Sequence, residues 1–170
     1  MNTTNVKLYS CDYGQARTWL VAALFVLGNI ALPQLCHLIP DGGRILLPVY
    51  FFTLVGAWKY GWRAGIIIAL ASPLANSLLF GMPAAAALPV IMVKSSLLAL
   101  AAGLAAVRFR RASLLLIAAT VLTAHIAGSL FEWAYTGSII KALQDFRLGA
   151  AGIVLQIVGC RLFLRYVIRK

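Results

Sequence analysis

Residues 84–135 read AAAALPVIMVKSSLLALAAGLAAVRFRRASLLLIAATVLTAHIAGSLFEWAY. The stretch contains two long apolar runs, at 84–107 and 113–135, separated by a short segment with three arginines. A run of about 20 apolar residues is the length at which an α-helix crosses the hydrocarbon core of a bilayer. Because an arginine-rich turn joins the two runs, the stretch predicts a helical hairpin in a membrane.

The composition extends this interpretation to the whole chain. Hydrophobic residues make up 62% of the 170 residues, charged residues make up 11%, and the mean hydropathy is +0.92. Soluble domains carry about 25% charged residues. The net charge of +11 would suggest nucleic acid as the partner of a soluble protein. Here the basic residues fall between apolar runs, so they indicate membrane orientation and no nucleic-acid binding.

Apolar runs also occur at 17–36, 45–58, 62–80 and 148–167. With the central hairpin they predict an all-α integral membrane protein, a bundle of six transmembrane helices. We expect one transmembrane domain over 1–170, with a polar N-terminal tail at 1–15. The more polar segment 136–147 is expected to form a short interfacial helix before the last span.

The positions of lysine and arginine predict the orientation. With six spans and the N-terminus inside, most basic residues fall in cytoplasmic segments, which favours N-in and C-in. The outer segments hold Arg44, Lys141 and Arg147, and the inner ones hold Lys7, Arg17, Lys59, Arg63, Arg108, Arg110, Arg111, Arg161, Arg165, Arg169 and Lys170.

The motifs of soluble catalysis are missing from the sequence. It has no phosphate-binding glycine loop ending in Lys-Ser/Thr, no Gly-x-Ser-x-Gly, no His-Glu-x-x-His and no Cys-x-x-Cys. Cys11, Cys36 and Cys160 are scattered and odd in number, so we interpret them as small apolar residues. We therefore expect no catalytic residue, no metal, no cofactor and no ATP hydrolysis by this chain alone.

Five polar side chains lie within the predicted spans: Asn76, Lys94, His125, Glu132 and Gln156. A charged group at membrane depth is costly unless it faces a cavity or a partner. At about 1.5 Å of rise per residue, all five fall in the outer half of the bundle. His125 and Glu132 are seven residues apart and share one helix face. The sequence thus predicts an outward-facing binding site, with Trp133 as the residue that stacks on a ligand ring.

A structural interpretation stays open for the same residues. Asn76 and Gln156 would then form hydrogen bonds between helices, and His125 would bond to a neighbouring helix. Lys94 and Glu132 would form an ion pair, which is also expected whenever no ligand pairs with the lysine.

Two breaks in the apolar pattern are expected to gate the site. They are the loop after the first span and the turn after the third, both rich in glycine and proline. The gate residues are Asp41, Gly42, Gly43, Arg44, Gly81 and Met82.

Landmarks between residues 47 and 83 carry a family resemblance. They are LPVYFF at 47–52, Gly56, YGWRAG at 60–65, SPLAN at 72–76 and FGMP at 80–83. In these the chain resembles the substrate-binding S components of energy-coupling factor (ECF) vitamin transporters. His125 and Trp133 add a weaker likeness to the thiamine-specific branch, although the spacing after Phe131 departs from it. The Ala-x-x-x-Ala docking pattern of the family is replaced on the first span by Ala22-Ala23.

The resemblance implies a six-helix subunit of a bacterial cytoplasmic (inner) membrane. Such a subunit captures a vitamin or related micronutrient from outside and catalyses no reaction. Its implied partners are a transmembrane scaffold subunit and two ATPase subunits. Two other functions stay open from the residues themselves. One is a small membrane enzyme that uses His125 and Glu132 on a lipid-linked substrate, and the other is a structural membrane partner protein.

Overall fold

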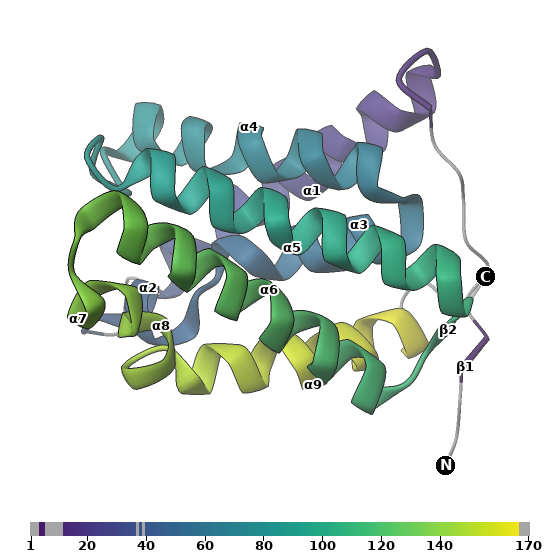
Figure 1. Ribbon diagram of the computed structural model, residues 1–170. Helices are drawn as coiled ribbons and strands as arrows, with labels where there is room; N and C mark the ends of the chain where they lie inside the picture. Colours follow the sequence, from purple (N-terminus) through teal and green to yellow (C-terminus); the bar gives the residue numbers. More distant parts are fainter. Residues whose placement is uncertain (1–3, 6–11, 37, 39, 167–170) are drawn as a thin grey trace.

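Long apolar helices form most of the molecule. The computed structural model describes residues 4–5, 12–36, 38 and 40–166. Among these residues, four helices are long and apolar enough to cross a membrane. They are α1 (Ala16–Cys36), α4 (Trp62–Phe80), α5 (Leu88–Phe109) and α6 (Leu114–Thr136), shown in Figure 1. These bounds agree closely with the predicted spans, and the all-α membrane fold is confirmed to that extent.

Two shorter helices complete the bundle, α3 (Val49–Tyr60) and α9 (Ala150–Tyr166). The second predicted span, 45–58, is divided in the structure, since α2 (Gly42–Leu46) precedes α3. Leu47 separates the two helices with a φ of 48°, in the left-handed region, and Pro48 follows as the N-cap of α3. The last predicted span corresponds to α9, and its residue 167 lies outside the described residues.

Short elements gather at the two ends of the bundle. At one end lie α2, α7 (Ile139–Ala142) and α8 (Gln144–Arg147), and we call this the lid end (Figure 1). The predicted interfacial helix at 136–147 is thus two short helices. At the other end, which we call the ribbon end, β1 (Thr4–Asn5) pairs antiparallel with β2 (Arg111–Ala112). The Arg161 guanidinium also donates a hydrogen bond to the carbonyl of Ala112 there.

The packing has a buried centre and an apolar exterior. Helix α3 contacts α1, α4, α5 and α9, and its residues Leu54, Val55, Ala57 and Trp58 are fully buried. The outward face of α1 instead exposes leucines, namely Leu20, Leu24 and Leu27. A wide apolar exterior of this kind suits lipid rather than water.

A polar network ties α1 to its neighbours inside the bundle. The Asn29 amide donates to Thr53 Oγ1 and to Ser72 Oγ, at 3.1 Å each, and its oxygen accepts from the backbone N–H of Phe52. The network joins α1, α3 and α4. Hydrogen bonds of this kind hold apolar helices together where no water competes.

Candidate functional site

Lys94 is the centre of a buried charge cluster near the lid end. Its side chain extends from α5 and is 5% exposed. The Nζ atom lies 2.5 Å from Glu132 Oε2 on α6 and 2.8 Å from Asp145 Oδ2 on α8. The contact with Asp145 is a hydrogen bond, whereas the angles of the Glu132 contact are those of an ion pair alone. One lysine thus joins three elements.

His125 connects this cluster to the last helix. Its Nδ1 lies 3.6 Å from Asp145 Oδ2, and its Nε2 lies 3.3 Å from Gln156 Oε1 on α9. Both ring nitrogens therefore face oxygen acceptors. A protonated imidazole donates a hydrogen bond to Gln156 and forms an ion pair with Asp145, whereas a neutral ring with its proton on Nδ1 accepts from the Gln156 amide once that amide is turned over. In either arrangement one amide atom of Gln156 lacks a partner, although the side chain is fully buried.

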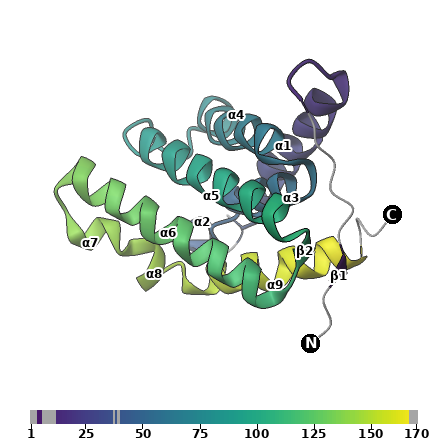
Figure 2. The same cartoon turned by 45° about the vertical axis from the view of Figure 1, so that its right-hand side comes forward.

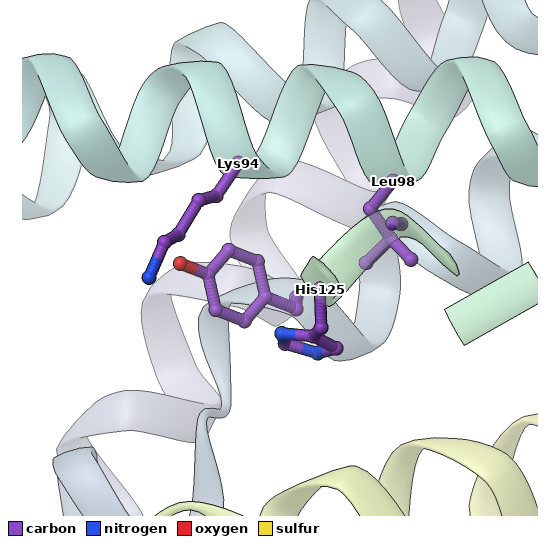
Figure 3. A pocket seen from close by; sticks show the side chains of 5 residues that line it. Lys94, Leu98 and His125 are labelled. Carbon is purple, nitrogen blue, oxygen red and sulfur yellow. The ribbon is translucent and has the colours of Figure 1, made fainter. Parts of the chain in front are cut away.

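Aromatic rings enclose His125 on two sides. The Tyr50 ring meets it edge-on with centroids 5.6 Å apart, and the Phe146 ring of α8 lies at 6.2 Å. Tyr50, Lys94, Leu98, Ala124 and His125 line a pocket too narrow to hold a water molecule. Figure 3 shows Lys94, Leu98 and His125 directed toward this shared space. The pocket has no room for a ligand in this structure, so a ligand binds there only if an element of its wall moves.

Asp145 titrates under opposing influences. Burial raises the pKa of its carboxyl group, but the neighbouring His125 imidazole and the Lys94 ammonium outweigh that effect and lower the pKa below its usual value. The side chain is therefore a carboxylate at neutral pH. Two carboxylates, those of Glu132 and Asp145, therefore face the one Lys94 ammonium.

A glycine makes room for the lysine. Gly128 lies on the α6 face that meets α5, between His125 and Glu132 in sequence. A Cβ atom at this position would lie 2.7 Å from Lys94 Cγ, closer than real Cβ atoms approach. The neighbouring Ser129 hydroxyl is buried and has no hydrogen-bond partner in the structure. At this part of α6, Lys94 packs tightly against Gly128, and the Ser129 hydroxyl next to it is free to bind another polar group.

The structure brings four of the six predicted binding residues together: Lys94, His125, Glu132 and Gln156. Asn76 belongs instead to the network around Asn29, where its amide donates to the carbonyls of Asn29 and Ser72. Its Oδ1 is buried and unpartnered. Trp133 is 49% exposed on α6, and its stacking role stays a prediction.

The predicted gate residues lie near the same end but outside the cluster. Gly42 is buried in α2, Gly43 follows it, and Asp41 and Arg44 form an exposed ion pair at 3.9 Å. Gly81 ends α4 with a φ of 68°, and Met82 is exposed. Their gating role stays a prediction.

Asp145 was missed by the sequence reasoning as a site residue. Depth was considered only for residues inside apolar spans, and Asp145 lies in the polar segment after the fifth span. The signal available was that segment itself, where an acidic residue and the aromatic Phe146 are adjacent next to a predicted span.

These features define a class of protein. The chain is an all-α protein with helices suited to a membrane and a narrow pocket near one end, lined in part by buried polar side chains. Within the part of the chain that the structure describes, no three His, Cys, Asp or Glu side chains are grouped as metal ligands. Comparison with protein-family models, with curated proteins and with solved structures gives no match.

Proposed function

We propose that this protein is the substrate-binding subunit of an ECF-type transporter, taking up a small water-soluble vitamin or related micronutrient. The observation that carries the proposal is the cluster of Lys94, Glu132, His125 and Gln156 with Asp145. Ionisable groups inside a membrane bundle are commonly placed there to meet a polar solute. The resemblance of the sequence landmarks between residues 47 and 83 to ECF S components is the reason for proposing this family of transporters.

The proposal includes the topology. The chain crosses a bacterial cytoplasmic membrane six times, and α3 and α9 serve as its short spans. The α3–α4 turn, the α5–α6 turn and the C-terminal end of α9 all lie at the ribbon end (Figure 1). Since these segments are rich in arginine and lysine, the ribbon end is cytoplasmic and the lid end faces outward.

Energy for uptake comes from partners under this proposal. The protein binds and releases the solute without covalent chemistry, and a scaffold subunit with two ATPase subunits drives the movement. In sealed vesicles the purified chain should bind a solute but not accumulate it. Accumulation by this chain alone, without ATPase subunits, would contradict the partner-dependent mechanism.

The test begins with whatever small molecule the protein retains. The full chain is purified in bilayer nanodiscs and denatured, and the released molecules are identified by mass spectrometry. Wild type and the exposed-lysine control Lys141→Ala should retain the same polar molecule. Lys94→Ala and His125→Ala should bind it at least about 30-fold more weakly, because loss of a buried charged partner costs about 2 kcal/mol or more.

Two results would contradict the proposal. If both variants keep their melting temperature and bind within about threefold of wild type, the site is elsewhere, since threefold is only about 0.7 kcal/mol. If wild type retains nothing and no vitamin from a water-soluble set raises its melting temperature, the binding function is wrong.

Mutual pairing of the charges favours one other function. Lys94 contacts both Glu132 and Asp145 directly, as it would in a structural partner protein whose polar groups only hold helices together. Such a protein would retain no solute. The membrane-enzyme alternative instead requires turnover of a lipid-linked substrate by the purified chain.

A further inference from the structure

The segment between Gly137 and Gly149 forms a cover over the charge cluster. It contains α7 and α8, which lie between the ends of α6 and α9 (Figure 2). Gly137 ends α6 with a φ of 67°. Phe146 lies against the His125 ring, and Asp145 reaches Lys94. We call residues 137–149 the lid.

Asp145 is the only charged contact between the lid and the pocket among the described residues. Two nitrogen groups converge on one of its oxygens, the Lys94 ammonium at 2.8 Å and His125 Nδ1 at 3.6 Å. Convergent nitrogen donors around one carboxylate oxygen are how proteins recognise carboxylates in ligands. The geometry would serve a free carboxylate as well as it serves the side chain.

Exchange of Asp145 for an anion would conserve the charge of the cluster. If Asp145 left with the lid, Lys94 and Glu132 would remain as a neutral pair at 2.5 Å. An entering anion would then restore the charge that the cluster has in this structure. Donors are also available beside the pocket, since the Ser129 hydroxyl and, in the amide orientation of this structure, the Gln156 nitrogen are buried and unpartnered.

We propose that Asp145 occupies the position of an acidic group of the ligand, so that the lid carries a tethered competitor for the site. The ligand class is then a small molecule with a carboxylate, or an anion of similar shape, that displaces Asp145 from Lys94 and His125. This inference rests on the proposed function, because it assumes that a solute enters this pocket.

Chemical rescue tests the inference directly. Asp145→Ala removes the three heavy atoms of the carboxylate, and formate has three heavy atoms. Sodium formate at 100 mM should raise the melting temperature of Asp145→Ala by about 2 to 4 °C over sodium chloride at equal ionic strength. Wild type should change by less than about 1 °C, because Asp145 already fills the position.

Two controls locate the effect. Lys94→Met combined with Asp145→Ala removes the ammonium and should abolish the rescue. Asp145→Asn keeps the shape of the side chain and leaves no space, so formate should not stabilise it. An equal formate effect in the double variant or in wild type, or no effect in folded Asp145→Ala, would overturn the inference.

A cationic ligand is the rival class, because two carboxylates face one lysine. Methylammonium chloride at 100 mM tests it, and stabilisation of wild type by methylammonium with no formate rescue would assign the site to cations. If Asp145→Ala does not fold in chloride, it is purified in formate throughout. Monodisperse protein in formate but not in methylammonium supports the inference, and recovery in neither overturns it.

The two proposals fail separately. Formate rescue reports on the carboxylate position whether or not a natural solute is known. Rescue, when wild type retains no solute and no vitamin raises its melting temperature, would keep the anion position and contradict the transport function. A retained neutral or cationic solute, with no formate rescue of Asp145→Ala, would support the transport function and contradict the anion position.

Discussion

Lys94 fits against α6 only because residue 128 is glycine. A Cβ atom at Gly128 would lie 2.7 Å from Lys94 Cγ, near the base of the side chain, where rotation about later bonds gives no relief. Glycine in a helix normally destabilises it by about 1 kcal/mol relative to alanine. The glycine at position 128 therefore lowers the stability of α6 but leaves the space in which Lys94 packs.

Gly128→Ala should therefore destabilise the protein despite alanine's higher helix propensity. Overpacking a core costs about 1 to 3 kcal/mol of folding free energy. Most of that range is larger than the about 1 kcal/mol by which alanine favours a helix over glycine. We expect a fall in melting temperature of about 2 to 4 °C in detergent. Gly14→Ala is the control, since no atom lies near its Cβ position. An unchanged or higher melting temperature for Gly128→Ala would mean that the lysine is not confined there.

Lys94→Met should be more damaging than the loss of any exposed lysine. The substitution leaves Glu132 and Asp145 mostly buried without their cation, and breaking a buried pair costs about 3 to 5 kcal/mol. Combining it with Glu132→Gln and Asp145→Asn should recover most of the loss, because no charge is then unpaired. Melting temperatures of the single and triple variants measure this, with Lys141→Met as control. Equal stability of the single and triple variants would contradict the pairing.

The stability contributed by Asp145 should depend on pH in acid. Because the folded-state pKa is lowered, the unfolded chain binds protons first as pH falls, and the contribution is complete above the ordinary value of 3.8. It should be lost as pH falls below 3.8 through the lowered pKa. The melting-temperature difference between wild type and Asp145→Asn should thus be constant from pH 5 to 7 and shrink below pH 3.8. Asp41→Asn, at an exposed carboxylate, is the control. A difference that shrinks already above pH 5 would contradict the sign of the shift.

The proposed topology predicts where reporters fused to the chain will lie. Fusions after Arg111 and at the C-terminus should both report cytoplasmic positions, and one after Gly81 should report the outer side. Active alkaline phosphatase at the outer fusion and active fluorescent protein at the inner ones would be the readout. Opposite sides for the two inner fusions would mean an odd number of spans between them, and the count of six would then be wrong.

Helix positions were predictable because span length and apolar composition are local properties. Apolar runs of sufficient length located α1, α4, α5 and α6 to within a few residues. The division at Leu47 was not predictable, because a left-handed φ at leucine depends on the packing around it. Hydropathy does not report such local backbone geometry.

The candidate site was predictable in part for a different reason. Lys94, His125, Glu132 and Gln156 are conspicuous because a membrane span rarely carries such residues. Hydrogen-bond partners, however, depend on how each helix is rotated, which hydropathy does not determine. This is why Asn76 was grouped with the cluster, whereas the structure joins it to Asn29. Asp145 enters the cluster through chain reversal after α6, a tertiary feature that no span pattern contains.

In the proposed six-span topology, where α9 crosses the membrane, the unequal helix lengths have a consequence for the surrounding lipid. At about 1.5 Å per residue, the 17 residues of α9 extend for about 25 Å, less than the roughly 30 Å of a typical hydrocarbon core. The 23 residues of α6 beside it exceed that thickness. Helix α3 is enclosed by other helices, so its short length does not affect the thickness of the bilayer. Helix α9, in contrast, exposes Val154, Leu155 and Val158. The bilayer should therefore thin locally along α9, so that lipids with shorter acyl chains collect on that side of the molecule.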